Sequence, residues 1–108
     1  PNNSNMNNSL LIINQLFEIQ QKLREMGKAE SFERNFNRLF AVFEEDGFIV
    51  QNPTNEAYSD SRTDCEASIA GSLSSKMKIT KTLKPIIYRK DNANVQLLQK
   101  AVVIVEKT

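Results

Sequence analysis

The chain has 108 residues, 40% of them hydrophobic and 25% charged, with a net charge of +1 at pH 7. Such a chain forms one ordinary domain, or a small β domain with a helical part, and it is too short for two large cores. It contains no histidine, which excludes Ser/His and Cys/His nucleophile pairs and most zinc or other transition-metal sites.

The cysteine and apolar content also limit the cellular compartment expected for the protein. Cys65 is the only cysteine, so no internal disulfide forms and a reducing compartment is expected, with the cytoplasm as the default location. The apolar run at 10–13 is too short to span a membrane and lacks the flanks of a signal peptide, so no membrane association is expected. Three scattered glycines form no phosphate-binding loop, and no cofactor is expected.

The chain begins with eight mainly polar residues and continues into a helical pattern. Residues 1–8 are predicted to be a disordered lead-in, or a remnant ahead of a native start at Met6. From Ser9 to Met26, apolar residues recur at spacings of four, three, four and three, which predicts a helix with a heptad seam. Gly27 is expected to end this helix.

A second helix is predicted from Ser31 to Asp46, with Gly47 ending it, so that residues 9–46 form an antiparallel hairpin. Two helices alone leave one side of each apolar seam uncovered. Dimerisation into a four-helix bundle is the simplest way to cover it. The alternative is that both faces pack on the protein's own β part. The expected dimerisation residues are Ile12, Leu16, Ile19, Leu23, Phe32, Phe36, Leu39 and Phe43.

Beyond Gly47 the apolar spacing changes from helical to alternating, which predicts a small, mainly antiparallel β domain over residues 47–108. The fold class is therefore α+β. Residues 57–63 are predicted to be a loop, 91–94 a hairpin loop, and 101–105 the central strand, while Pro85 interrupts a strand or marks an edge. The other predicted strands are 48–51, 65–69, 77–84, 86–89 and 95–98.

Charge is divided unevenly between the two parts. Residues 9–46 hold five basic and seven acidic groups, whereas residues 47–108 hold nine and six. The excess comes from Lys76, Lys78, Lys81, Lys84, Arg89 and Lys90. These cations could meet nucleic-acid phosphate or an acidic protein, or could simply solvate a strand face. Only Tyr88 is nearby for base stacking, so nucleic acid is not the expected partner.

Candidate catalytic groups are few. Alternation places Asp64 and Glu66 on one face of a strand, where two carboxylates could in principle act as acid and base. Nothing in the sequence around them predicts a buried site that would raise a pKa, and a polar face pairing with Arg62 is the favoured interpretation. Cys65 is interpreted as a small buried hydrophobic residue rather than a nucleophile. We therefore expect no enzyme activity.

The junction between helix and strand contains Phe-Glu-Glu-Asp-Gly at 43–47, the segment 48–60 with its Pro53, Glu56, Tyr58 and Asp60, and Cys-Glu-Ala at 65–67. These motifs, in this order, resemble the GrpE family of nucleotide exchange factors. The final segment 98–107 is similar to the last strand of that family. Cys65 stands where the family usually has His, and Gln99 where it has Arg.

The resemblance implies a homodimer whose β domain binds the nucleotide-binding domain of a DnaK-type chaperone and opens its cleft to release ADP. No catalytic group is needed for that, because binding the open chaperone better than the closed one is sufficient. A dimeric adaptor without exchange activity and a basic nucleic-acid-binding module remain alternatives. The residues that the resemblance places in contact with the partner are Pro53, Glu56, Tyr58, Asp60, Glu66, Gln99 and Lys100.

Overall fold

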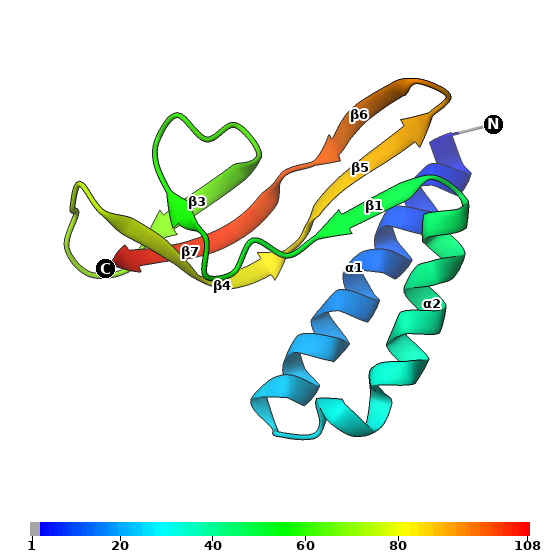
Figure 1. Cartoon of the computed structure of the whole chain (residues 1–108), viewed down its shortest axis with the longest axis horizontal. Helices are drawn as coiled ribbons and strands as arrows, with labels where there is room; N and C mark the ends of the chain where they lie inside the picture. Colours follow the sequence, from blue (N-terminus) through cyan, green and yellow to red (C-terminus); the bar gives the residue numbers. More distant parts are fainter. Residues whose placement is uncertain (1–2) are drawn as a thin grey trace. The chain divides into compact units, whose positions relative to one another are not determined.

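The computed structural model describes residues 3–108 and divides into two compact units, Pro1–Phe48 and Ile49–Thr108. Two helices come first and a mainly antiparallel β part follows, which confirms the predicted α+β class (Figure 1). Three elements make up the helical unit: α1 (Asn3–Glu25), the short 3₁₀ helix η1 (Ala29–Phe32) and α2 (Glu33–Glu45).

Helix α1 begins earlier than predicted. Residues 3–8, expected in a disordered lead-in, form its first turns, while residues 1 and 2 of that segment lie outside the described residues. Met6, the one apolar residue among 3–8, is half-buried. At the other end, Gly27 ends the helix as predicted, with φ of 73°. The amides of Gly27 and Lys28 donate to the carbonyls of Arg24 and Leu23, which is a Schellman motif.

The second helix starts later than predicted. Residues 29–32, including Ser31, form η1, and Phe32 lies at the N-cap of α2 with no side-chain cap hydrogen bond. Its φ of −112° and ψ of 3° fall outside the helical region, so the backbone kinks there before α2 begins. Gly47, with φ of 93°, ends α2 as predicted, and its amide donates to the carbonyl of Glu44.

The apolar faces of the helical unit are only partly covered. Ile13 and Phe17 on α1, Phe36 on α2 and the following Phe48 are buried, and the rings of Phe43 and Phe48 meet edge to face at 6.1 Å. The residues expected in the dimer seam divide into two groups. Leu16, Leu23, Phe36 and Phe43 are buried or half-buried, whereas Ile12, Ile19, Phe32 and Leu39 are 43–48% exposed.

The β unit contains two sheets that share one long hairpin. The strands are β1 (Phe48–Gln51), β2 (Ala57–Tyr58), β3 (Cys65–Ile69), β4 (Met77–Lys84), β5 (Ile86–Asp91), β6 (Asn94–Gln99) and β7 (Ala101–Lys107). One sheet has the order β1-β5-β6, and the other has the order β2-β4-β7-β3 (Figure 1). Strand β7 lies inside the four-stranded sheet, as predicted, and its pairing with β3 is parallel.

Pro85 separates the two sheets, which settles its predicted role as an interruption. Proline has no N–H to donate, so the β4–β7 ladder stops there and pairing resumes between β5 and β6. The Gln99 side-chain amide donates to the Pro85 carbonyl at 2.9 Å, on the strand opposite the break. At the far end, Asp91 pairs with Asn94 around a two-residue turn in which Asn92 has φ of 56°.

Two irregularities in β4 overturn part of the predicted alternation. The register with β7 shifts between Ile79 and Lys81 and again between Thr82 and Lys84. Thr82 is consequently buried and Leu83 is 47% exposed, whereas regular alternation from the buried Ile79 would place Leu83 inside. Strand β2 is a further difference, because its two residues fall in the segment 57–63 that was predicted to be a loop.

The core of the β unit lies on one face of the four-stranded sheet. It is built from alternate residues of β7, joined by residues of β3, β4 and β5. Tyr58, Ala67 and Tyr88 pack against this cluster and are partly buried. The buried members are Cys65, Met77, Ile79, Ile86, Ala101, Val103 and Val105.

Candidate functional site

The residues that the resemblance assigns to a partner surface have very different exposure. Pro53 is fully buried, and Tyr58 packs against the core. Gln99 is half-buried and bonded to the Pro85 carbonyl. The remaining four side chains are exposed to solvent: Glu56, Asp60, Glu66 and Lys100. These four are the most exposed of the assigned side chains.

Arg62 connects several parts of this segment. Its guanidinium donates to Asp64 Oδ1 at 2.7 Å, to Glu56 Oε1 at 2.7 Å and to the Ala57 carbonyl at 3.1 Å. The arginine therefore ties the turn at 59–64 to both β2 and the start of β3. The predicted pairing of this polar strand face with Arg62 is confirmed for Asp64, while Glu66, two residues later on β3, remains exposed.

These ion pairs perturb the ionisation of both partners. The hydrogen bond from Arg62 lowers the pKa of the Asp64 carboxyl, and the hydrogen bond to Asp64 is the largest cause that raises the pKa of Arg62. Because the folded pKa of Asp64 lies below the ordinary 3.8, its contribution to stability is present above that pH and is lost on further acidification. At neutral pH both side chains are therefore charged, and their ion pair helps to hold the turn at 59–64.

Gln99 and Lys100 directly precede β7 and so lie at the same end of the four-stranded sheet as Asp64, which directly precedes β3. The Ala101 amide donates to the Asp64 carbonyl at 2.9 Å, and Cys65 pairs with Ala101 in the parallel ladder. Residues about 35 positions apart in sequence therefore start neighbouring strands side by side. The exposed Lys100 and Glu66 belong to this end, which we call the β3–β7 end: Arg62, Asp64, Glu66, Gln99 and Lys100.

Cys65 is buried in the core, as predicted from the sequence. Its side chain is 7% exposed, and burial is the main cause that raises the pKa of the thiol to about 11. The thiol is therefore protonated at neutral pH, and nucleophilic chemistry requires the thiolate.

The raised pKa of Cys65 gives a testable dependence of stability on alkaline pH. Between pH 9 and 11 the folded state keeps the proton that the unfolded thiol releases, so stability falls as pH rises, by about 1–3 kcal/mol. Cys65→Ala removes this titration and should lose less stability over the same range. Urea unfolding of both proteins at pH 8 and 10.5 measures the difference. Equal losses in the two proteins would show that the thiol is not the titrating group.

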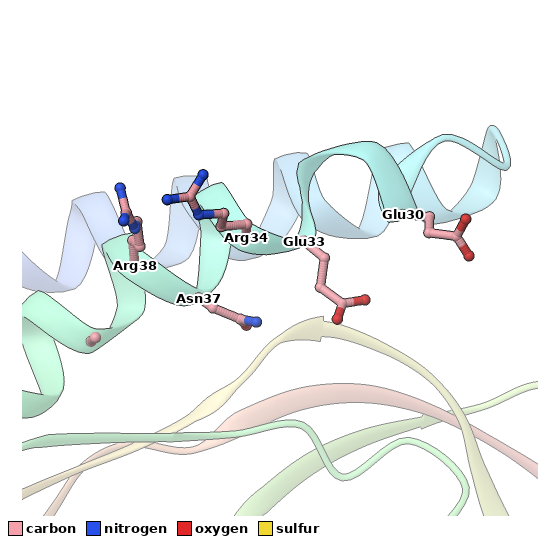
Figure 2. Close-up of a pocket in the computed structure, with 6 residues that line it drawn as sticks. Glu30, Glu33, Arg34, Asn37 and Arg38 are labelled. Carbon is pink, nitrogen blue, oxygen red and sulfur yellow. The ribbon is translucent and has the colours of Figure 1, made fainter.

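A groove on the helical unit was not foreseen from the sequence. It has a volume of about 520 Å³ and lies along η1 and α2. Figure 2 shows that the carboxylate of Glu33 and the guanidinium of Arg34 project in different directions, and no ion pair joins the lining side chains among residues 3–108. Residues at spacings of three and four form its lining: Glu30, Glu33, Arg34, Asn37, Arg38 and Ala41. This is the polar face of an amphipathic helix.

Within residues 3–108, no group of three or more His, Cys, Asp or Glu side chains is placed to hold a metal ion. None of the helices in this range has an apolar stretch of the length needed to cross a bilayer. Comparison of the chain with protein-family models, with curated proteins and with solved structures finds no match.

Proposed function

We propose that this protein is a GrpE-like co-chaperone in the cytoplasm, which binds a DnaK-type chaperone as a homodimer and promotes ADP release. The observation that supports this most is the β3–β7 end. Two segments that resemble the family, 65–67 and 98–107, contribute to the neighbouring parallel strands β3 and β7, and Glu66 and Lys100 are exposed at this end. The resemblance is based on the order of the motifs in the sequence. The parallel pairing of β3 and β7 supports it, because it brings two of these motifs side by side.

The proposed mechanism requires only differential binding. A protein that binds the open nucleotide cleft more tightly than the closed one shifts the chaperone towards the open state, from which ADP leaves. A hundredfold faster release corresponds to about 2.7 kcal/mol of such preference. Exposed polar groups and partly exposed apolar groups can supply this energy, and no covalent step is involved.

The dimer is part of the proposal. Ile12, Ile19, Phe32 and Leu39 occupy seam positions and are 43–48% exposed in the single chain. Covering them with the same face of a second chain would bury apolar surface at about 25 cal/mol per Å². A closed two-fold dimer of hairpins is the assembly that uses one such face on each chain.

The adaptor alternative also has an observation in its favour. Glu56 is engaged with Arg62, and Gln99 is engaged with the Pro85 carbonyl, so both side chains have structural tasks within the chain. A protein with the same scaffold but without exchange activity would still need these contacts. The two functions differ in their effect on nucleotide release, which can be measured directly.

The test is release of a fluorescent ADP analogue from a DnaK-type chaperone of the same organism, with and without this protein. We expect saturable acceleration by the wild-type chain. The double variant Glu66→Ala/Lys100→Ala, which leaves the net charge unchanged, should reduce the acceleration about tenfold by removing exposed contacts. These two side chains are suitable because both are exposed, whereas Glu56 is held in an ion pair with Arg62.

The matched control removes one lysine and one glutamate from the turn between the helices. Lys28→Ala/Glu30→Ala also keeps the net charge, and both side chains are exposed. This variant should accelerate release as the wild type does. Absence of acceleration by a folded wild-type dimer that still binds the chaperone would replace the exchange factor with the adaptor.

A further inference from the structure

Strand β6 lies at the open edge of the three-stranded sheet (Figure 1). It pairs with β5 on one side, and no strand within residues 3–108 pairs with its other side. At six residues, β6 is the longest of the four edge strands, since β1 has four residues, β2 has two and β3 has five. The outer side of β6 therefore presents an extended backbone to which another strand can bond.

The sequence of β6 lacks the features that usually protect such an edge. Proteins place charged residues or proline on edge strands to prevent pairing with another chain. Asn94–Gln99 contains neither, and consists of asparagine, glutamine, valine and leucine. By contrast, the edge strand β3 carries Glu66, and β1 is closely followed by Pro53. Val95 and Leu97 lie on one face of β6 and are 56% and 38% exposed.

The turn before β6 determines which of its backbone groups point outward. Asp91 and Asn94 pair directly across a two-residue turn, so they exchange backbone hydrogen bonds with each other. Hydrogen-bonded and non-hydrogen-bonded pairs then alternate along β5 and β6. Val95 and Leu97 therefore occupy non-hydrogen-bonded positions in the pairing with β5. Their N–H and C=O groups point away from β5, towards the open edge.

We infer that β6 pairs antiparallel with β6 of a second copy of this chain, across a two-fold axis at Gln96. In this register, Val95 of each copy lies opposite Leu97 of the other, and the two Gln96 residues lie opposite each other. The outward backbone groups match, because Val95 and Leu97 become the hydrogen-bonded pairs of the new ladder. The result is a continuous six-stranded sheet with apolar side chains paired on one face. An axis at Leu97 instead would set Val95 opposite Gln99 and lose this apolar pairing.

The chemistry of the strand favours a second copy over a different partner. Self-pairing brings each residue near its own kind, so a charged strand would repel itself, and β6 has no charged residue. The nearest cations are Arg89 and Lys90 on β5, and three strand spacings, at least roughly 14 Å, separate each from its symmetry mate. This separation exceeds the Debye length of about 8 Å at physiological salt. An uncharged strand is therefore the matching partner, and the β6 sequence itself supplies one with its apolar residues in register.

This contact is distinct from the proposed helical dimer and does not rest on exchange activity. The pairing covers residues 94–98, which include none of the residues assigned to the seam or to the chaperone. Five residues on each side bury far less than the roughly 1,200–2,000 Å² of a stable interface, so we expect association to require protein at hundreds of micromolar, roughly, or more. It would act where the protein is locally concentrated. Failure of the ADP-release experiment would leave this inference untouched, and failure of β6 pairing would leave the exchange proposal untouched.

Disulfide trapping in the full chain tests the register. Gln96→Cys places two thiols opposite each other at the axis, where the Cα atoms of a non-hydrogen-bonded pair are about 4.5 Å apart, within disulfide range. Asn94→Cys is the matched control, because Asn94 is exposed on the same strand and face but would lie roughly 14 Å from its symmetry mate. In a glutathione redox buffer with about 0.5 mM protein, we expect at least about tenfold more covalent dimer from Gln96→Cys. The wild-type chain, whose single Cys65 is buried, gives the background.

A charge variant tests the apolar pairing. Val95→Lys/Leu97→Lys, combined with Gln96→Cys, puts four ammonium groups into the new ladder and should lower the yield of covalent dimer by at least about tenfold. The matched control adds the same charge at exposed leucines outside this sheet, as Leu73→Lys/Leu83→Lys. It should keep the yield within about threefold of that from Gln96→Cys alone. Amide spectra of the ¹⁵N-labelled chains verify that both variants remain folded.

Hydrogen exchange of the wild-type chain tests the backbone pairing. As the protein concentration rises from about 0.05 to about 2 mM, exchange of the Val95 and Leu97 amides should slow by at least about threefold. The Asn94 and Gln96 amides bond to β5 at every concentration, so their exchange should change much less.

Three outcomes would overturn the inference. Equal covalent yields from Gln96→Cys and Asn94→Cys would indicate random collision instead of one register. Equal yields from the two charge variants would show that β6 does not form the contact. If the Val95 and Leu97 amides gained no protection at the highest concentration but were protected by an alternating valine–threonine peptide, the edge would belong to a strand of another protein.

Discussion

Truncating Ile79 to alanine is expected to lower the free energy of unfolding of the β unit by about 2–5 kcal/mol. The side chain has 0% exposure and lies in the core cluster on β4, where its loss leaves a cavity that neighbours only partly fill. The chain has no tryptophan, and both of its tyrosines lie in the β unit against this cluster. Urea unfolding followed by tyrosine fluorescence therefore reports on this unit.

The matched control is the same truncation at a less covered site. Ile69→Ala on β3 removes an identical group that is already 44% exposed, so we expect a loss of less than about 1.5 kcal/mol. The helical signal at 222 nm gives a second comparison, because both helices lie in the other unit. If Ile79→Ala cost no more than Ile69→Ala, the position of the core would be wrong.

The ends of the helices were largely predictable because they depend on local chemistry. Gly27 and Gly47 adopt positive φ at the two C-termini, where other residues would be strained. The N-termini were predicted less well, because neither predicted start, Ser9 or Ser31, begins an α-helix in the structure. Helix α1 extends to Asn3 and a 3₁₀ turn precedes α2, and helix length in proteins depends more on tertiary packing than on local propensity.

The strands were predicted from alternation, but their partners were not. Cys65–Ile69 was predicted as a half-buried strand, while its parallel pairing with β7 joins residues about 35 positions apart, for which periodicity carries no information. The register shifts in β4 are equally hidden. Because of them, Thr82 rather than Leu83 lies in the interior, and Lys81 lies on the same face as Lys78. Nothing local in the sequence marks these shifts.

The candidate partner surface was predictable only in its outline. The motif order marks 53–66 and 99–100, and the structure gathers part of these segments at the β3–β7 end. Sequence could not tell that Pro53 is fully buried or that Gln99 is bonded to the Pro85 carbonyl. Both depend on the break between the two sheets, which is a property of the long hairpin as a whole.

Placing aspartate at two seam positions, Ile19→Asp/Leu39→Asp, is expected to convert the proposed homodimer into a monomer. Both side chains are about half-exposed in the single chain, at 47% and 45%, so the charges remain hydrated in the monomer and the hairpin should still fold. In a two-fold dimer four carboxylates would enter one apolar interface, and burying unpaired charges is costly. We expect the dimer to weaken at least a hundredfold, as measured by sedimentation equilibrium.

The control places the same charges on exposed apolar residues outside the seam. Leu11 and Val42 are 59% and 60% exposed, and each is about a quarter turn or more from the seam of its helix. Leu11→Asp/Val42→Asp should therefore leave the dimer intact. Equal dissociation of both variants would indicate a different interface, and a monomeric wild type at tens of micromolar would remove the bundle from the proposal. Because exchange is proposed for the dimer, the seam variant should also lose acceleration of ADP release, while the control variant keeps it.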